Sequence, residues 1–267
     1  MNSNEPMIHL TKISYTYRKT VALNQINLSI AKGEFIALIG PNGSGKTTLI
    51  KLLSGYLHPT EGIASLDGHP LTQWSHKSLS RNIAVVPQQV TIPFSFTGRQ
   101  IALMGRLPHM GLSAPKIEDH EAAEEALELT GATDLAERTY NSLSSGEKQK
   151  IIIAQALARK SRILLLDEPI SHLDIKWQIQ TLQHLSTINT LGSTIVTAIH
   201  DLNLAAIYFP RLVLISKGQI VADGSPATVL TSKLLEEVYE TKVVIHYPFD
   251  TRYPQISPMP IQAPILP

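Results

Sequence analysis

Eight consecutive residues near the N-terminus combine glycines, a lysine and a threonine in an order suited to holding phosphate. They are Gly40, Pro41, Asn42, Gly43, Ser44, Gly45, Lys46 and Thr47. Glycines let backbone amides approach an anion closely, and the N-terminus of a following helix favours negative charge. Lys46 adds a positive charge, and the hydroxyl of Thr47 suits Mg²⁺. The pattern G-x-x-x-x-G-K-[ST] predicts a nucleoside triphosphate site if a strand precedes it and a helix follows.

Two adjacent acids, Asp167 and Glu168, end an apolar run over residues 162–166. Adjacent side chains at the end of a strand point to opposite sides. One carboxylate can therefore serve a metal ion while the other faces an attacking water. In this interpretation Asp167 holds Mg²⁺ through its water shell, and Glu168 positions the nucleophile. Taken alone, such a pair is more often a helix cap, because acids favour helix N-termini.

Short apolar runs separated by helical patterns predict the scaffold that positions these residues. The runs span residues 35–39, 83–86, 163–166, 195–199 and 212–215. Such alternation is typical of an α/β domain with a largely parallel sheet. The first run directly precedes the phosphate-binding pattern, and a helical pattern over 48–53 follows it, so the required context is present.

Two other regions have different patterns. Closely spaced strand-like segments at 7–13, 21–30 and 62–66 predict an antiparallel β piece beside the parallel sheet. The strand signal then stops between Gln89 and Leu143, which predicts a helical insertion. The helices expected there span 97–106 and 117–130.

These patterns divide the chain into three parts. We expect a core formed by residues 1–88 and 144–246, with the helical insertion at 89–143. Residues 247–267 are rich in proline, which is excluded from helix interiors and central strands. An extended tail is predicted there.

Composition excludes several functional classes. Among 267 residues, 23 Lys and Arg oppose 22 Asp and Glu, and a formal net charge of +1 argues against nonspecific binding to DNA or acidic membranes. The absence of cysteine excludes disulfides and thiolate sites. The best candidate for a membrane span, residues 194–215, is interrupted by polar and charged residues, and residues 1–9 lack a secretory signal pattern. We therefore expect a protein that is soluble or peripheral to a membrane.

The segment Leu143-Ser144-Ser145-Gly146-Glu147-Lys148-Gln149 lies just before a helical run at 150–158. It resembles the signature motif of the ATP-binding-cassette (ABC) ATPases. Together with the phosphate loop, the run that ends in Asp167-Glu168, the segment 171–174 and His200, this resemblance covers nearly the whole chain in the family's order and spacing. It implies a P-loop NTPase core with an antiparallel β subdomain and an inserted α-helical subdomain.

The resemblance also implies roles for residues around one nucleotide. Tyr17 would stack on the adenine, and residues 40–48, including Thr48, would cradle the triphosphate. Gln88 would sense Mg²⁺ and the nucleophilic water and link them to the helical insertion. His200 would contact the γ-phosphate. Tyr15 is the rival of Tyr17, Gln89 is the rival of Gln88, and a lone histidine is usually structural outside such a context.

A second set of residues would act on the nucleotide of a partner protomer. The resemblance implies that Ser144 and Gly146 reach the γ-phosphate of the other copy and that Asp174 lies at the protomer boundary. A serine and a bare backbone at a helix N-terminus form an anion site, which makes this role physically reasonable. Two residues depart from the family pattern: Ser145 replaces the usual first glycine, which matters if that position needs a positive φ, and Ile170 replaces a common threonine.

Two stretches point to a subclass. Residues 103–109, Leu-Met-Gly-Arg-Leu-Pro-His, and the segment 241–256 are similar to importer ATPases for iron-siderophores, haem and cobalamin. We expect a homodimer on the cytoplasmic face of the cell membrane, docked on permease subunits and indirectly served by a substrate-binding protein. ATP and Mg²⁺ are the implied ligands, and no nucleic acid is expected. The alternatives are an ATPase for zinc, manganese or molybdate, a non-transport ABC protein, or a subunit that binds ATP only as a structural clamp.

Overall fold

A six-stranded sheet lies at the centre of the molecule, in the strand order β10-β9-β3-β8-β7-β6. The computed structural model describes residues 7–110, 113–248 and 253–259. The strands are β3 (Phe35–Ile39), β6 (Ile83–Val86), β7 (Ile163–Asp167), β8 (Thr194–Ala198), β9 (Arg211–Ser216) and β10 (Gln219–Gly224). The first five are parallel, and β10 pairs antiparallel with β9 at one edge. The predicted α/β class with a largely parallel sheet is confirmed.

The central sheet is covered on both faces, which explains why its strands are nearly continuous apolar runs. Every residue of β3, β7 and β8 is buried. Alternate residues point to opposite faces, so Ile36 and Leu38 belong to one hydrophobic core while Ala37 and Ile39 belong to the other. A parallel sheet with both faces covered produces this pattern.

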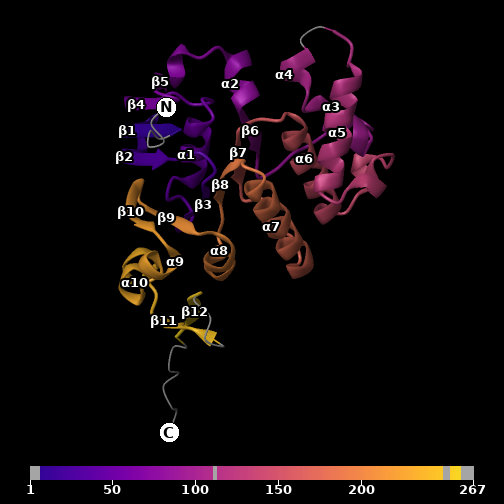
Figure 1. Cartoon of the computed structure of the whole chain (residues 1–267). Coiled ribbons are helices and arrows are strands. Elements are labelled where there is room, and N and C mark those ends of the chain that lie inside the picture. The colour runs from indigo at the N-terminus through magenta and orange to yellow at the C-terminus, as the bar shows by residue number, and fades with distance from the viewer. Residues whose placement is uncertain (1–6, 111–112, 249–252, 260–267) are drawn as a thin grey trace.

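An antiparallel sheet and the helix after β3 form the layer on the first face. This sheet has the order β2-β1-β4-β5. Its strands are β1 (Ile8–Tyr17), β2 (Thr20–Ile30), β4 (Glu61–Leu66) and β5 (His69–Pro70). Helix α1 (Lys46–Leu53) lies between the two sheets and shares their hydrophobic core. The predicted antiparallel β piece is thus present beside the parallel sheet (Figure 1).

Helices make up the second layer and the side of the molecule. They are α2 (His76–Asn82), α3 (Gly98–Met104), α4 (Leu107–Met110), α5 (Ile117–Leu129), α6 (Ser145–Ala158), α7 (Ile175–Thr190), α8 (Leu202–Tyr208), α9 (Pro226–Val229) and α10 (Ser232–Tyr239). Helices α3 to α6 are grouped on one side (Figure 1), where α6 packs against α3, α5 and β6. Helix α6 therefore connects the helical group to the edge of the central sheet. No helix in the described parts of the chain is long and apolar enough to cross a bilayer.

The predicted extended tail needs correction. Residues Gln255–Pro258 form β12, which pairs antiparallel with β11 (Val243–His246). Asn203 of α8 fixes this strand, because its side-chain oxygen accepts a 2.7 Å hydrogen bond from the backbone N–H of Ile256. A two-stranded ribbon has only edge strands, and proline is tolerated at the ends of edge strands. Residues 249–252 and 260–267 of the predicted tail lie outside the described residues.

Candidate functional site

The turn between β3 and α1 is built on glycines that no other residue could replace without strain. Gly40 has φ +142° and Gly45 has φ +113°. A Cβ on Gly40 would lie 2.0 Å from the carbonyl oxygen of Ile215, and one on Gly45 would lie 2.7 Å from that of Ala22. The backbone N–H of Gly218 donates to the Ser44 carbonyl at 2.9 Å. The loop is therefore held from outside by other backbone segments.

Lys46 lies within this turn rather than extending into solvent. Its Nζ donates to the carbonyl oxygens of Gly40, at 2.7 Å, and Pro41, at 2.9 Å. Only 5% of the residue is exposed, and burial lowers the pKa of its ammonium group, while Glu168 and Asp167 act in the opposite direction. The chain thus keeps a buried cation beside a loop whose backbone suits an anion.

Thr47 and Asp167 meet at the end of β7. The Thr47 hydroxyl donates to Oδ1 of Asp167 at 3.0 Å. Burial of Asp167 raises the pKa of its carboxyl group, and the Thr47 hydrogen bond lowers it. A hydroxyl and a carboxylate are the oxygen ligands that Mg²⁺ prefers. In residues 7–110, 113–248 and 253–259, no group of three His, Asp or Glu could hold a metal ion.

The side chain of Glu168 is held from two sides. Gln88 Nε2 donates to Oε2 of Glu168 at 2.6 Å, and His200 Nε2 contacts Oε1. Gln88 follows β6, Glu168 follows β7 and His200 follows β8. The carboxyl ends of parallel strands meet at one edge of a sheet, which is where α/β proteins bind ligands. Glu168 has φ +54°, an unusual backbone conformation for a residue with a side chain. The structure thus brings three predicted residues into direct contact.

A cleft of about 260 Å³ unites most of the predicted residues. It is lined by Tyr17, Thr20, Val21, Ala22, Asn42, Gly43, Ser44, Gly45, Lys46, Thr47, Thr48, Glu168 and His200. Tyr17 is 42% exposed. The rings of Tyr15 and Tyr17 form a T-shaped contact with their centroids 4.8 Å apart, and Tyr15 does not line the cleft. The position of Tyr17 therefore favours it over Tyr15. The sequence did not mark Thr20, Val21 and Ala22, because they reach the cleft only through the placement of β2 beside the phosphate loop.

Ser144 and Gly146 lie at the start of α6 and do not line this cleft. Ser144 is the N-cap, and its hydroxyl and backbone N–H both donate to Glu147 Oε2, at 2.9 and 2.8 Å. These bonds lower the pKa of the Glu147 carboxyl group. Gly146 is buried. The start of α6 therefore lies outside the cleft of its own protomer.

Asp174 is likewise outside the cleft, where it caps α7. Its Oδ1 accepts a 3.0 Å hydrogen bond from the backbone N–H of Trp177. The two departures from the family pattern are accommodated. Ser145 is the first residue of α6 and is not among the residues with positive φ, so no glycine is needed there. Ile170 is 5% exposed and belongs to the hydrophobic core.

The stretch 103–109 is a structural corner. Helix α3 ends before Gly105, where a Cβ would lie 2.0 Å from the carbonyl oxygen of Gln155 on α6. Arg106 donates to Oδ1 of Asp119 at 2.9 Å and to the carbonyl of Ala158 at 3.0 Å. The stretch therefore joins α3, α5 and α6, and its residues have a structural reason to be present.

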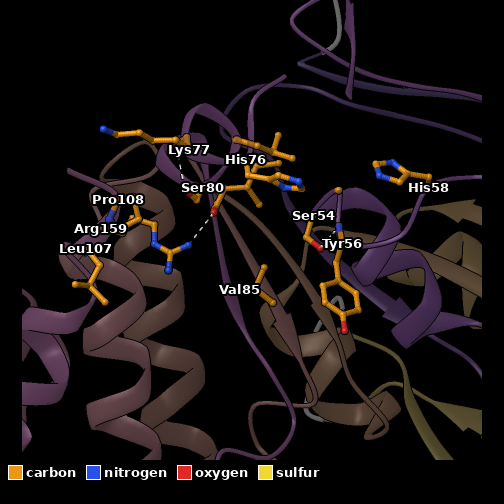
Figure 2. A pocket seen from close by; sticks show the side chains of 13 residues that line it. Ser54, Tyr56, His58, His76, Lys77, Ser80, Val85, Leu107, Pro108 and Arg159 are labelled. Atoms are coloured by element: carbon orange, nitrogen blue, oxygen red, sulfur yellow. Dashed lines mark hydrogen bonds between the residues drawn. The ribbon is translucent and has the colours of Figure 1, made fainter. Parts of the chain in front are cut away.

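A larger cavity of about 720 Å³ lies between the end of α1, α2, β6 and α4 (Figure 2). Tyr56, Val85 and Leu107 expose apolar side chains there, with exposed fractions of 77%, 36% and 56%. The remaining lining includes His58, His76, Lys77 and Arg159 and, among the residues that the structure describes, no aspartate or glutamate. This is an apolar surface with a cationic rim, separate from the cleft beside Lys46.

Comparison with known proteins groups these features under one family. Residues 23–171 match the family model described as ABC transporter. The chain is 40% identical to the hemin import ATP-binding protein HmuV of Nocardia farcinica, over 84% of this chain and 77% of that relative. It is 37% identical to the ferric enterobactin transport ATP-binding protein FepC of Escherichia coli K12, over 88% of this chain and 87% of that relative.

Solved structures agree. A metal-chelate type ABC transporter in an inward-facing conformation aligns with a TM-score of 0.83 at 28% identity, over 96% of this chain and 98% of that chain. A dimeric bacterial ABC transporter cassette aligns with a TM-score of 0.74 at 30% identity, over 82% of this chain and 99% of that chain. The predicted P-loop fold of this class is confirmed.

Proposed function

Because this chain belongs to the ABC transporter family and is one of its ATP-binding and ATP-hydrolysing proteins, we propose that it energises uptake of an iron complex, haem or cobalamin through a membrane permease. The observation that carries the ATPase part is the contact of Glu168 with both Gln88 and His200 at the edge of the cleft that holds Lys46. This arrangement places a carboxylate and an imidazole beside a phosphate-binding turn.

The geometry suggests how the chain hydrolyses ATP. Backbone amides of the loop and Lys46 would bind the phosphates, and Tyr17 would cover the adenine. Glu168 would accept a hydrogen bond from the attacking water, and its own contacts with Gln88 and His200 fix its orientation. The water oxygen bonds to the γ-phosphorus as the bond to ADP breaks, and the water's protons pass to phosphate or solvent. Thr47 and Asp167 would hold Mg²⁺, whose charge would offset that of the phosphates.

We propose that two copies form a head-to-tail dimer with two shared sites. Support comes from Ser144 and Gly146, which stand at a helix N-terminus yet do not line the cleft of their own protomer. A helix N-terminus is suited to the γ-phosphate of a partner. The dimeric cassette to which this chain is similar provides a precedent. Ser144, Gly146 and Asp174 are proposed to face the partner.

The cargo class is supported by the relatives. One is named for hemin import and the other for ferric enterobactin transport, and the aligned transporter is of the metal-chelate type. These names favour an iron chelate or haem over cobalamin, zinc, manganese or molybdate. The same relatives argue against a non-transport role and against a subunit that binds ATP only as a structural clamp. A clamp would show no turnover stimulated by a permease.

The cavity in Figure 2 is proposed to receive a cytoplasmic helix of the permease. Tyr56 and Leu107 lie on opposite sides of it with Val85 between them, so an apolar helix face can pack there. Its cationic rim favours a helix that presents carboxylates or its C-terminal carbonyls. The protein would then work on the cytoplasmic face of the cell membrane. The substitution Tyr56→Lys should prevent co-purification of the permease, and unchanged co-purification would contradict this assignment.

The central experiment removes the carboxylate that orients water. In Glu168→Gln, we expect turnover to fall by about 10²- to 10⁴-fold while ATP still drives dimerisation. Glu121→Gln, an exposed acid on α5, is the matched control and should behave as the unsubstituted protein does. Phosphate release and sedimentation velocity are the two measurements. Unchanged turnover in Glu168→Gln would contradict the proposed role of Glu168.

A transport assay tests the cargo. Vesicles containing the permease and this chain should accumulate radiolabelled iron-siderophore or haem with ATP inside. Uptake of zinc, manganese or molybdate instead would support the alternative class.

A further inference from the structure

The buried face of Gly146 is covered by one aromatic side chain from another helix. A Cβ built on Gly146 would lie 2.6 Å from Cγ, 2.7 Å from Cδ2 and 2.9 Å from Cδ1 of Trp177. Separations below 3.0 Å are not found for real Cβ atoms. The indole therefore occupies the space that any other side chain at position 146 would need.

Trp177 is fixed in that position by several contacts. It is the third residue of α7, and its backbone N–H donates to the capping carboxylate of Asp174 at 3.0 Å. The ammonium of Lys150, one turn along α6 from Gly146, lies 4.6 Å from the indole centroid. Lys176 Nζ lies 5.3 Å from it. Cations at such distances from an indole face are attracted to it.

The position of Lys150 is itself determined by a further contact. Its Nζ donates to the carbonyl of Gly131 at 3.0 Å, at the loop after α5. The indole thus lies between the backbone of α6 at Gly146 and the ammonium group of Lys150 from the same helix, which the Gly131 carbonyl anchors. A side chain from the start of α7 is therefore packed directly on the start of α6.

We infer that Trp177 is a positioning residue that holds the starts of α6 and α7 as one unit, so that Ser144 and Gly146 reach the partner's nucleotide while Asp174 lies at the protomer boundary. This inference rests on the proposed head-to-tail dimer. It assigns Trp177 no contact with ATP, because Trp177 does not line the cleft. Its effect should therefore appear in dimer closure and turnover and not in nucleotide binding by the monomer.

Substitutions of the two tryptophans of the chain test this role. We compare Trp177→Ala and Trp177→Phe with Trp74→Phe, each alone and with Glu168→Gln. Trp177→Ala should need about tenfold more ATP or protein to dimerise and should lower kcat about tenfold, because a small misplacement of a reacting group is costly. Binding of a fluorescent ATP analogue to the dilute monomer should be unchanged. Trp177→Phe keeps an aromatic face for Gly146 and Lys150 and should restore most of the loss, and Trp74→Phe should resemble the unsubstituted protein.

A double-mutant cycle gives a second readout. Gly146→Ala should impair dimerisation strongly when the indole is present and add little when Trp177→Ala has already made room. Equal losses in both backgrounds would overturn the inference, as would normal ATP-driven dimerisation of Trp177→Ala. Weakened binding by the Trp177→Ala monomer would also overturn it, because the effect would then be general damage. If the unsubstituted protein and Trp74→Phe both fail to dimerise with ATP, the proposed dimer is wrong, which is a distinguishable result.

Discussion

The phosphate loop and the start of α6 are proposed to act on the same nucleotide, one from each protomer, yet they keep their shapes by different means. The loop relies on backbone conformations open to glycine and on carbonyls of distant segments that press against Gly40 and Gly45. The start of α6 is an ordinary capped helix, in which Ser144 and Glu147 satisfy each other. Its one unusual feature is the indole of Trp177 over Gly146. We therefore expect the phosphate loop to bind nucleotide by itself, and the start of α6, which side chains hold in place, to have a separate role.

The strongest test of that contrast mixes two inactive variants. Lys46→Ala should abolish nucleotide binding by the monomer, whereas Ser144→Ala should keep binding, and each should lower turnover by about 10²- to 10³-fold. When the two variants are mixed, half of the dimers contain one copy of each. In such a dimer, the loop of the Ser144→Ala copy and the helix start of the Lys46→Ala copy together form one intact shared site. About a quarter of the original turnover should return if the interface is symmetric and the sites are independent. Phosphate release after mixing is the measurement, and no recovery would indicate that each protomer supplies a whole site.

Substitutions in the phosphate loop and at the start of α6 should also differ in how much they lower the free energy of unfolding. Gly40→Ala should lower the free energy of unfolding by about 3 kcal/mol or more, because its Cβ would overlap the Ile215 carbonyl. Gly43 has φ +74°, but a Cβ there would meet no atom within 4 Å, so Gly43→Ala should cost only about 1 kcal/mol. Ser144→Ala removes a helix cap and should also cost about 1 kcal/mol. Urea unfolding of the three variants gives the order, and equal losses would show that crowding at Gly40 is unimportant.

Contacts between side chains stabilise the group formed by helices α3 to α6. Arg106 and Asp119 form a pair whose side chains are 12% and 9% exposed. Asp119→Asn should lower the free energy of unfolding by about 3 kcal/mol, since it leaves a nearly buried guanidinium without its negatively charged partner. Urea unfolding at neutral pH measures this loss, and a loss below that of Ser144→Ala would contradict it.

The same pair predicts a pH dependence. The backbone N–H of Lys116, followed by Arg106, lowers the pKa of the Asp119 carboxyl group. A lowered pKa in the folded state gives stability that is complete above the unfolded value of about 3.9 and is lost as the pH falls through the folded value. The difference between Asp119→Asn and the unsubstituted protein should therefore be full at neutral pH and shrink below about pH 4. Urea unfolding of both proteins across this pH range measures it, and a difference that stays constant down to pH 3 would contradict the linkage.

The sequence predicted well where a local pattern determines structure. The continuous apolar runs identified the buried parallel strands, and the glycine-rich pattern identified the turn between β3 and α1 that contains Lys46. Ser145 shows a limit, because whether it needed a positive φ could only be read from the helix that begins there. The importer-like stretch around Arg106 also joins helices α3, α5 and α6, a structural role that the sequence alone does not reveal.

What the sequence could not predict depends on contacts between distant segments. The indole over Gly146 comes from 31 positions later in the chain, and no local pattern marks that approach. Strand β12 forms because Asn203 fixes it from α8, although prolines on both sides argued for an extended tail. The lining of the cleft by Thr20, Val21 and Ala22 likewise needs the antiparallel sheet to be placed beside the phosphate loop. Such packing is decided by the tertiary structure as a whole.

The adenine end of the cleft offers one more comparison. Tyr17 lines the cleft, and Tyr15 packs against its ring in a T-shaped contact without lining the cleft. Tyr17→Ala should weaken ATP binding to the monomer about tenfold, within the range of about 1–3 kcal/mol that stacking of a base on an aromatic ring supplies. Tyr15→Ala should weaken it less, because it removes only a support. Titration of a fluorescent ATP analogue distinguishes the two, and a larger loss for Tyr15→Ala would give the stacking role to Tyr15. Because Tyr17 lines the cleft and Ser144 does not, the losses from Tyr17→Ala and Ser144→Ala should add in kcat/KM, as expected for two half-sites that act independently.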